Sequence, residues 1–466
     1  MAAILSNSSG GGNWSDSTIW AGLVTPVEGD TVIITGSDII YIDQNIHIGA
    51  DTSTPAVLIS TGTTLYVTSS VAGNYSMSCK GDLVVSGAFF IGSGVDYIPQ
   101  SRTFDLKLNY STTGLITGGK YGLLIGHSGT LCFKGAPLTC SWTYITGSLG
   151  INSSSITTSI ATAWPSNSQI IIASTTKTYT QAEFRTLNSN ATGTNLNIVS
   201  TMSYFHDGSG SKEAEIGILT RNIKISSFNP YPLSSSYIIN SPNTKLDIDW
   251  CEFYGVGYNA TNKYGSIILK NNVGGTASIQ SCSIWGNVGG SNTAIYFNAT
   301  NLKNVYLEGN VIYSCSNGIS NVANSVPSGT EAIVKNNLFC FGQGSALSLT
   351  TTMRFWLISN SINSWNGSAI NLPILALTGS SEEQTGKIDY NNMHSCNQYG
   401  ISFTTVARYC TLIGNKIWRN NTGGIIFSGN VYIVKFIDHN MFGNGTDQIS
   451  FSNINAGSVS FINCNF

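Results

Sequence analysis

Charged side chains are scarce in this sequence. Only 9% of its 466 residues are Asp, Glu, Lys or Arg, compared with about 25% in ordinary globular proteins. The formal net charge is −2 and no basic run is present, which argues against a protein that binds nucleic acid by neutralising phosphates. Hydrophobic residues still make up 41% of the chain, so there is enough apolar material to build a core.

Long apolar runs are also missing. The N-terminus, MAAILSNSSGGGNW, has no positively charged start, and no stretch approaches the ~18 apolar residues of a membrane span. We therefore expect no signal peptide, no transmembrane segment and no membrane partner. The ten cysteines form no C-x-x-C pair and the five histidines do not cluster. This pattern predicts reduced cysteines, no metal site and no cofactor.

Large apolar residues recur through the second half of the chain at steps of 24 to 31 residues. Between them, short runs rich in Ile, Val, Phe and Tyr alternate with corners rich in Asn, Gly and Ser. This pattern is typical of several short strands per repeat. The recurring residues are Phe228, Phe253, Ile284, Val311, Leu338, Ile362, Met393, Ile417, Met441 and Phe466.

The repeat predicts an all-β fold, namely a right-handed parallel β-helix of about ten C-terminal coils over 221–466. We expect a β-rich cap and the first coils over 13–220, and a flexible arm over 1–12. Of the 47 Asn residues, 35 lie in 229–466. Asn tolerates left-handed corners and its amide can bond the Asn one coil away. The ladder predicted on this basis contains Asn310, Asn337, Asn392, Asn440 and Asn465.

Two resemblances accompany this pattern. The repeat over roughly 220–466 resembles the pectin-lyase-like β-helix superfamily. Residues 13–48, 164–185 and 202–225 contain, in order, phrases similar to the eight-glycine domain and its continuation in the fibrocystin and cell-surface hyaluronidase family. EIGILTRNI, which starts at Glu215, is the most specific phrase. The resemblance implies a β-rich cap that leads into a β-helix and, less directly, a glycan-handling activity.

Asp247 and Asp249 form the clearest candidate catalytic pair. In LDIDWCEF they alternate with apolar residues, so both should face outward from one strand, roughly 7 Å apart. This separation fits an inverting glycosidase, and Glu252 is expected to continue the row. The competing interpretation is a solvated strand face or a cation site, because the next coil, ASIQSCSIW, offers no basic or imidazole partner.

Further candidate site residues are one histidine and five aromatic residues. His206 lies in SYFHDGSG and is a candidate proton shuttle without a partner recognisable in the sequence. Aromatic rings along the flank of a β-helix can bind sugar rings, although such rings more commonly fill core corners. The aromatic candidates are Trp285, Trp356, Trp365, Trp418 and Tyr399.

The sequence leaves two main functions open. The favoured one is a structural protein on the surface of a bacteriophage particle, assembled in the host cytoplasm, as a capsid decoration or a fibre-like or spike-like protein that can bind glycans. A solenoid of extracellular type without an export signal suggests this route. The alternative is a polysaccharide depolymerase, a hyaluronidase-like hydrolase or a lyase, that uses Asp247, Asp249 and Glu252. A bacterial adhesin is disfavoured by the missing signal.

The expected partners follow from the favoured function. The last phrase, VSFINCNF, leaves an open strand edge, and such edges invite pairing. We expect other virion proteins or further copies of the chain to cover it, and glycans to be the remaining partners.

Overall fold

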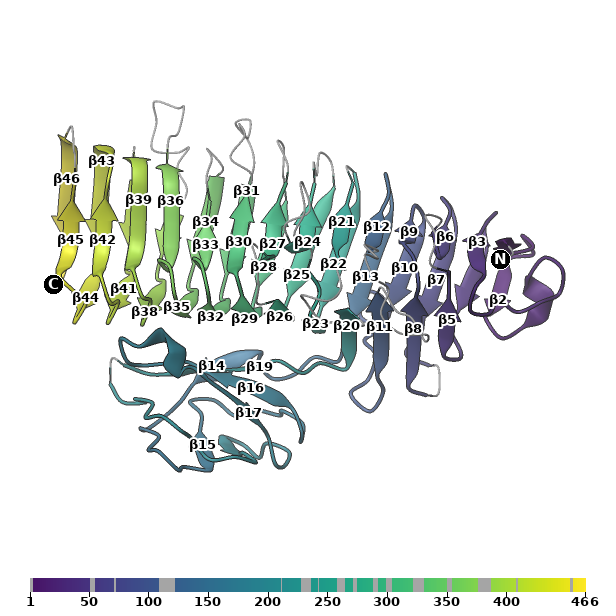
Figure 1. Cartoon of the computed structure of the whole chain (residues 1–466), viewed down its shortest axis with the longest axis horizontal. Coiled ribbons are helices and arrows are strands. Elements are labelled where there is room, and N and C mark those ends of the chain that lie inside the picture. Colours follow the sequence, from purple (N-terminus) through teal and green to yellow (C-terminus); the bar gives the residue numbers. More distant parts are fainter. Residues whose placement is uncertain are drawn as a thin grey trace. The chain divides into compact units, whose positions relative to one another are not determined.

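The computed structural model is almost entirely β-strand. Two short 3-10 helices, η1 (Ser17–Ile19) and η2 (Tyr179–Gln181), are the helical elements among the described residues. The strands wind into a parallel β-helix of about 13 turns, which confirms the predicted solenoid (Figure 1). The described residues are 3–50, 55–70, 73–108, 122–210, 212–227, 236–241, 243–257, 265–270, 275–287, 292–298, 304–321, 331–349, 354–375, 387–407, 410–452 and 456–466.

The chain divides into two compact units, 1–137 with 221–298 and 138–220 with 299–466. In the first unit, each turn adds one strand to each of three parallel columns. The first column contains β1 (Ala3–Leu5), β3 (Thr31–Ile34), β6 (Val57–Ile59), β9 (Leu83–Val85), β12 (Leu123–Ile125), β21 (Ile238–Asn240), β24 (Gly265–Leu269) and β27 (Thr293–Phe297). The second contains β2 (Gly11–Asn13), β4 (Ile39–Tyr41), β7 (Thr64–Val67), β10 (Ala88–Ile91), β13 (Thr130–Lys134), β22 (Lys245–Asp249) and β25 (Thr276–Gln280). The third contains β5 (Ile46–Ile48), β8 (Tyr75–Cys79), β11 (Phe104–Leu108), β20 (Ile223–Ser227), β23 (Cys251–Tyr254) and β26 (Ser283–Asn287).

Coils begin close to the N-terminus. Strand β1 pairs in parallel with β3, and β2 pairs with β4. Residues 3–5 and 11–12, which were expected to belong to a flexible arm over 1–12, are therefore parts of strands. Their backbone groups bond to the second turn, and this pairing gives a short Gly- and Ser-rich stretch its order.

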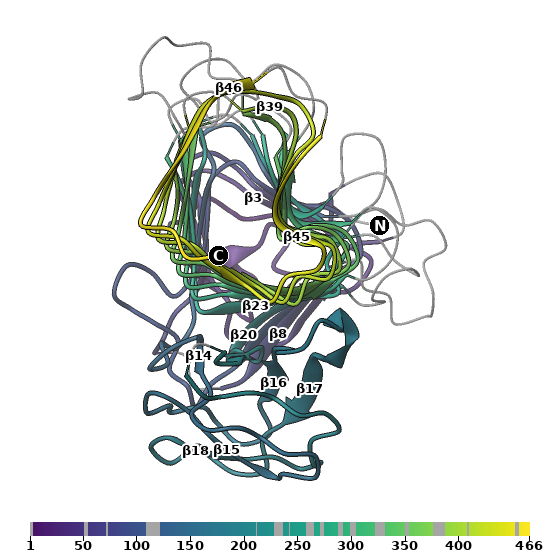
Figure 2. The ribbon, with the colours of Figure 1, turned by 90° about the vertical axis from the view of Figure 1, so that its left-hand side faces the viewer.

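The coils of the second unit continue the same three-strand pattern. Its first column contains β30 (Asn317–Asn321), β33 (Leu347–Ser348), β36 (Ile370–Leu375), β39 (Tyr399–Ala407), β42 (Gly423–Phe427) and β45 (Asp447–Phe451). Its second contains β28 (Val305–Glu308), β31 (Glu331–Lys335), β34 (Arg354–Ile358), β37 (Lys387–Asp389), β40 (Cys410–Ile413), β43 (Asn430–Ile437) and β46 (Ala456–Ile462). Its third contains β29 (Val311–Cys315), β32 (Leu338–Gly342), β35 (Ser361–Trp365), β38 (Asn392–His394), β41 (Lys416–Trp418) and β44 (Asn440–Phe442). In the end-on view, the coils from β39 to β46 lie nearly over one another (Figure 2).

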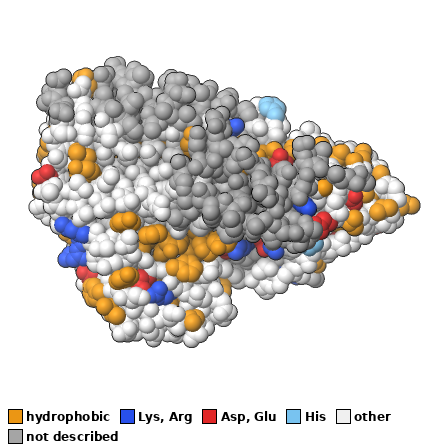
Figure 3. All heavy atoms as spheres, in the orientation of Figure 1, with side chains coloured by type: hydrophobic (Ala, Val, Ile, Leu, Met, Phe, Trp, Pro, Cys, Tyr) orange, Lys and Arg blue, Asp and Glu red, His pale blue; other side chains and the backbone are white. Residues whose placement is uncertain are grey.

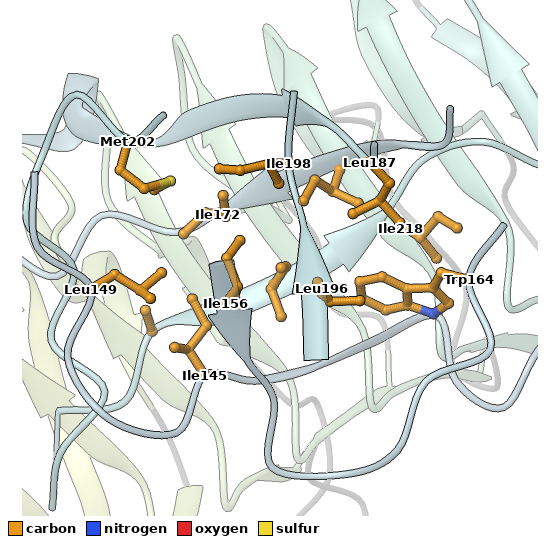
Figure 4. Close-up of a cluster of buried hydrophobic side chains, with 13 residues drawn as sticks. Ile145, Leu149, Ile156, Trp164, Ile172, Leu187, Leu196, Ile198, Met202 and Ile218 are labelled. Atoms are coloured by element: carbon orange, nitrogen blue, oxygen red, sulfur yellow. The ribbon is translucent and has the colours of Figure 1, made fainter. Parts of the chain in front are cut away.

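Residues 138–220 form a separate β-structure, which we call the inserted segment. It interrupts one turn of the solenoid, between β13 and β20. Its main antiparallel sheet has the order β14 (Trp142–Tyr144), β19 (Glu215–Ile218), β16 (Gln169–Ile172) and β17 (Glu183–Thr186). A second pair is β15 (Ser155–Thr157) with β18 (Asn195–Asn197). Trp164, Ile172, Ile218 and other apolar residues fill the core of this segment (Figure 4).

Equivalent apolar side chains form a continuous column inside the coils of the second unit. Register pairs join Phe339 to Ile362, Ile362 to Met393, and Met393 to Ile417, and Met441 follows. The predicted column is thus present, except that Val311 and Leu338 lie one residue out of register and occupy the opposite face of their strands. Phe228 lies outside the described residues.

The structure contains an Asn ladder, but some of its residues differ from the predicted ones. Each side-chain amide nitrogen donates to the side-chain oxygen one coil further along, at 2.9 to 3.0 Å. Asn310 and Asn337 belong to it, but Asn392, Asn440 and Asn465 lie one residue after the ladder positions. Asn391 takes the first of these positions, and His439 and Cys464 follow in register. The full buried ladder is Asn310, Asn337, Asn360, Asn391 and Asn415.

Corners next to the ladder need left-handed backbone. The residue before each ladder position has φ between 53° and 67°, a region that costs a residue with a Cβ about 1–2 kcal/mol. Gly309 and Gly414 avoid this cost, whereas Ser359 and Tyr390 bear it. The corner therefore explains the recurring Gly and Asn of the repeat.

Candidate active site

The candidate site lies on the outer face of three neighbouring strands of the first unit. Strand β13 pairs with β22, and β22 pairs with β25. In this register Lys134 is beside Asp249, and Ser278 is beside Asp247. Both aspartates are half-buried and alternate with buried apolar residues, so they face outward together, as predicted. Because the two aspartates are two residues apart on one strand, their Cα atoms lie about 6.6–7 Å apart.

Lys134 supplies the basic partner that the neighbouring sequence lacks. Its Nζ lies 2.7 Å from Oδ1 of Asp247, and the side chains are 10% and 28% exposed. Burial alone would lower the pKa of Lys134, but the hydrogen bond and charge of Asp247 outweigh burial and raise it. A charged ammonium group therefore stands against Asp247.

Asp249 has a different environment from Asp247. Burial raises the pKa of Asp249 despite the opposing effects of Lys134 and Tyr97, and the charge of Asp247 raises it further. The Tyr97 hydroxyl donates to Oδ2 of Asp249 at 3.2 Å. Burial and the Asp249 charge raise the pKa of Tyr97 in turn. The site thus combines a carboxyl that retains its proton to higher pH with a carboxylate paired to lysine.

Such a pair suits acid and base catalysis. Two carboxyl groups whose environments differ can act as proton donor and proton acceptor in one reaction. The ~6.6–7 Å spacing of their Cα atoms along the strand is close to the lower end of the ~6.5–9.5 Å carboxyl separation of inverting glycosidases.

Glu252 does not belong to this face. The corner at Trp250, with φ 54°, turns the chain into β23, so the predicted row of three acids is wrong. Glu252 is 3% exposed and accepts hydrogen bonds from the Arg221 backbone at 3.1 Å and from the Lys224 ammonium at 3.4 Å. Burial raises the pKa of Glu252. Its contacts tie neighbouring coils together.

His206, the candidate proton shuttle, is completely buried in the inserted segment, and it has a partner, Glu183, that the sequence did not reveal. Its Nδ1 donates to the Ala173 carbonyl at 2.7 Å, and its Nε2 lies 2.9 Å from Glu183. Burial would raise the pKa of Glu183, but His206, two backbone amides and Arg185 lower it. These contacts hold two loops of the segment together.

Three of the five aromatic candidates, Trp285, Trp365 and Trp418, are buried, which agrees with the interpretation that such rings fill core corners. Trp285 packs 4.3 Å from Tyr254, measured between ring centroids. Trp365 covers Gly342, where an added Cβ would lie 2.0 Å from the indole ring. Trp418 stacks on His394 at 4.2 Å. All three fill space that neighbouring coils leave open.

Trp356 and Tyr399 are half-buried. Trp356 points outward from β34, in register with Ile333 of β31 and Lys387 of β37. Tyr399 packs beside Gly423 at the start of β39. Their role in sugar binding stays a prediction.

Sequence reasoning missed Lys134 and Tyr97. Lys134 is 113 residues from Asp247 in the chain, because the inserted segment separates β13 from the next strand. The expectation that no basic partner exists rested on the next coil, ASIQSCSIW, whereas Lys134 lies on the strand at the other side of β22. Recognition of residues 138–220 as an insertion would have revealed the pair.

The described residues contain no group of three or more His, Cys, Asp or Glu that could hold a metal ion. Within the same part of the chain, no helix has the length and apolar character needed to cross a membrane.

Comparison with known proteins gives partial matches. No protein-family model matches the chain. Fibrocystin-L from Mus musculus is 29% identical over 225 residues, which cover 46% of this chain and 5% of that protein. Fibrocystin-L from Homo sapiens is 26% identical over 225 residues, with the same coverage. These alignments confirm the similarity to fibrocystin predicted from the sequence, although the match spans only one twentieth of the length of those relatives.

Solved structures that resemble the chain include phage tailspikes. Tailspike gp49 from Pseudomonas phage LKA1 has 12% identity and a TM-score of 0.36, and the match covers 87% of this chain and 72% of that one. Tailspike protein 3 of bacteriophage CBA120 has 9% identity and a TM-score of 0.37, with 93% and 56% covered. At such low TM-scores, the similarity assigns no function to this chain.

Proposed function

We propose that the protein is a polysaccharide-cleaving β-helix displayed on the surface of a bacteriophage particle. The observation that carries the proposal is the contrast between Asp249, whose pKa is raised, and Asp247, which is paired with Lys134 at 2.7 Å. Asp249 protonates the glycosidic oxygen as the bond to the anomeric carbon breaks. Asp247 takes a proton from the water that forms the new bond on the opposite face of the sugar.

The supporting roles follow from the contacts. Lys134 orients Asp247 through the 2.7 Å contact, and Tyr97 orients Asp249. The remaining surface fits a glycan ligand, because most of the described surface in the space-filling view is neither hydrophobic nor charged (Figure 3). Hydroxyl and amide groups there can exchange hydrogen bonds with sugars.

Incubation with a panel of neutral, acidic and capsular polysaccharides tests the proposal. New reducing ends would indicate hydrolysis, and unsaturated ends a lyase. Asp249→Asn should reduce product release by about 10²–10⁴-fold, as expected for loss of a general acid. Asp105→Asn is the matched control, because Asp105 is also partly exposed and lies 3.5 Å from Lys107. No product from any substrate, or full activity of Asp249→Asn, would contradict cleavage.

A second candidate is a display protein without catalysis. It is favoured by the pairing of each acid with protein groups, which is also how a structural cluster is satisfied. Mass spectrometry of gradient-purified particles tests display on its own. Detection in particles without cleavage would support this candidate, and detection only in cell lysate would contradict both versions.

The proposed partner at the last coil is a further copy of the chain or another particle protein. Phe451, Phe461 and Phe466 are 47%, 41% and 55% exposed there. Cross-linking of the particle followed by mass spectrometry should place peptides from this coil next to a partner. Cross-links confined to other faces would contradict this placement.

A further inference from the structure

An open pocket in the second unit is lined mainly by basic and aromatic side chains. Its volume is about 510 Å³, and it lies where the inserted segment meets the β41 and β44 coils. Lys177, Phe205, Asp207 and Lys212 come from the inserted segment, and Arg419 and Phe442 come from the coils.

The pocket concentrates positive charge in a chain with few charges. Three of the 21 basic residues line it, against one carboxylate, Asp207. No carboxylate among the described residues forms an ion pair with Lys177, Lys212 or Arg419, and Lys177 donates only to the Asn444 carbonyl, at 3.4 Å. Asp207 accepts hydrogen bonds from the Ser209 backbone and hydroxyl at 3.2 and 2.7 Å, and from Ser148 at 3.3 Å. A net positive pocket favours an anionic ligand.

Arg419 is held in place before any ligand arrives. It occupies a left-handed corner with φ 53°, where the equivalent residues of neighbouring coils are Gly443 and Ser395. A long side chain is unfavourable at this corner. It is fixed by a hydrogen bond from Nη1 to the Thr175 carbonyl and by packing of the guanidinium 5.7 Å from the Trp418 ring centroid. Nε and Nη2 have no acceptor among the described residues, and a guanidinium fork matches a carboxylate.

Aromatic rings add a surface suited to a sugar. Phe205 is 48% exposed, so part of its ring is open to a ligand in the pocket. Phe442 is half-buried and stacks 5.9 Å from Trp418. A ligand that is only an anion would gain nothing from these rings, whereas the C–H face of a sugar would pack on them.

We propose that this pocket binds a carboxylated saccharide unit, such as a uronate residue of a polysaccharide. Arg419, Lys177 and Lys212 bind the carboxylate, and Phe205 and Phe442 pack against the ring. The proposal is independent of the cleavage proposed above, because the pocket and Asp249 belong to different units.

Calorimetry with the full-length Asp249→Asn variant measures binding without turnover. The probes are an oligogalacturonate and a glucuronate-containing oligosaccharide, with maltohexaose as the neutral comparison and inorganic phosphate as the simple anion. We expect the acidic oligosaccharides to bind, with affinity falling as salt is raised, and maltohexaose to bind at least tenfold more weakly.

Variants of exposed side chains locate the binding. Lys177→Gln combined with Lys212→Gln should weaken oligogalacturonate binding more than tenfold, and Phe205→Ala should weaken it without changing the salt dependence. Lys387 lies on β37 and does not line the pocket, so Lys387→Gln should bind oligogalacturonate as tightly as the parent. The proposal is overturned if no acidic oligosaccharide binds, if the double variant binds as tightly as the parent, or if phosphate binds as tightly as the sugars.

Discussion

The carboxylate of Glu215 lies 3.0 Å from Nε2 of His394, and both side chains are completely buried. Glu215 comes from β19 of the inserted segment and His394 from β38 of the coils. The Ser361 hydroxyl and the amides of Asn363, at 3.3 Å, and Asn392, at 2.8 Å, also donate to the carboxylate. One buried carboxylate thus fastens the inserted segment to four side chains of two neighbouring coil strands, β35 and β38.

Removal of this carboxylate should destabilise the protein strongly. Glu215→Ala leaves His394 and three donors without their acceptor, so the free energy of unfolding should fall by about 3–5 kcal/mol. Urea unfolding and limited proteolysis of the inserted segment measure the loss. Glu213→Ala, two residues earlier and only half-buried, should change stability by less than about 0.5 kcal/mol. Equal effects of the two substitutions would contradict the role of Glu215.

The same carboxylate should make stability depend on acid pH. Burial would raise the pKa of Glu215, but the charge of His394 and hydrogen bonds from His394 and Ser361 outweigh burial and lower it. The unfolded chain therefore takes up this proton at higher pH than the folded chain. The stabilisation is complete above the unfolded pKa, about 4.3, and is lost as pH falls through the folded pKa. Unfolding midpoints from pH 6 to pH 3 should fall, and the fall should be smaller for Glu215→Gln. An equal fall of the unfolding midpoint with pH in the parent protein and in Glu215→Gln would contradict this role of Glu215.

The Asn ladder should be more sensitive to substitution inside the coil than outside it. Asn360→Ala removes a buried amide that donates to Asn391 at 2.9 Å and to the Val334 carbonyl at 2.8 Å, which should cost about 1–3 kcal/mol. Asn421→Ala removes an exposed amide that donates to Asn397 at 3.0 Å, and should cost about 0.5 kcal/mol or less. Denaturant midpoints give the comparison, and a larger loss for Asn421→Ala would speak against a stabilising buried ladder.

Substitution by glycine should stabilise the protein at one left-handed corner. Ser359 has φ 54°, so Ser359→Gly should relieve part of the ~1–2 kcal/mol left-handed penalty and raise the melting temperature. Ser402→Gly, in the middle of β39, should lower it, because glycine in a strand gives up about 0.5–1 kcal/mol. A melting temperature lowered by both changes would mean that the corner is not strained.

The sequence predicted the winding because inward positions repeat, but it could not fix which of two adjacent apolar residues faces inward. Val311 and Leu338 are buried although they point away from the column, because the inserted segment covers them. A Cβ added at Gly217 would lie 2.9 Å from the Leu338 side chain. Burial on both faces removes the alternation that reveals register.

Asn391 and Asn392 show the same limit at the ladder. Both are hydrogen-bonded, the first to the ladder and the second to Glu215, so composition alone does not separate them.

The candidate site was half predictable for another reason. Alternation along one strand identified Asp247 and Asp249, whereas Lys134 reaches them only because the coil closes after a long insertion.

Titration of the Asp249 carboxyl tests the central claim most directly. Carboxyl carbon NMR on protein labelled at aspartate, assigned with Asp249→Asn, should show this group protonating above the ordinary Asp value of about 3.9. Lys134→Met should move the midpoint higher, because the Lys134 charge lowers the pKa of Asp249. A midpoint at or below about 3.9, unmoved by Lys134→Met, would contradict the assignment of Asp249 as the proton donor.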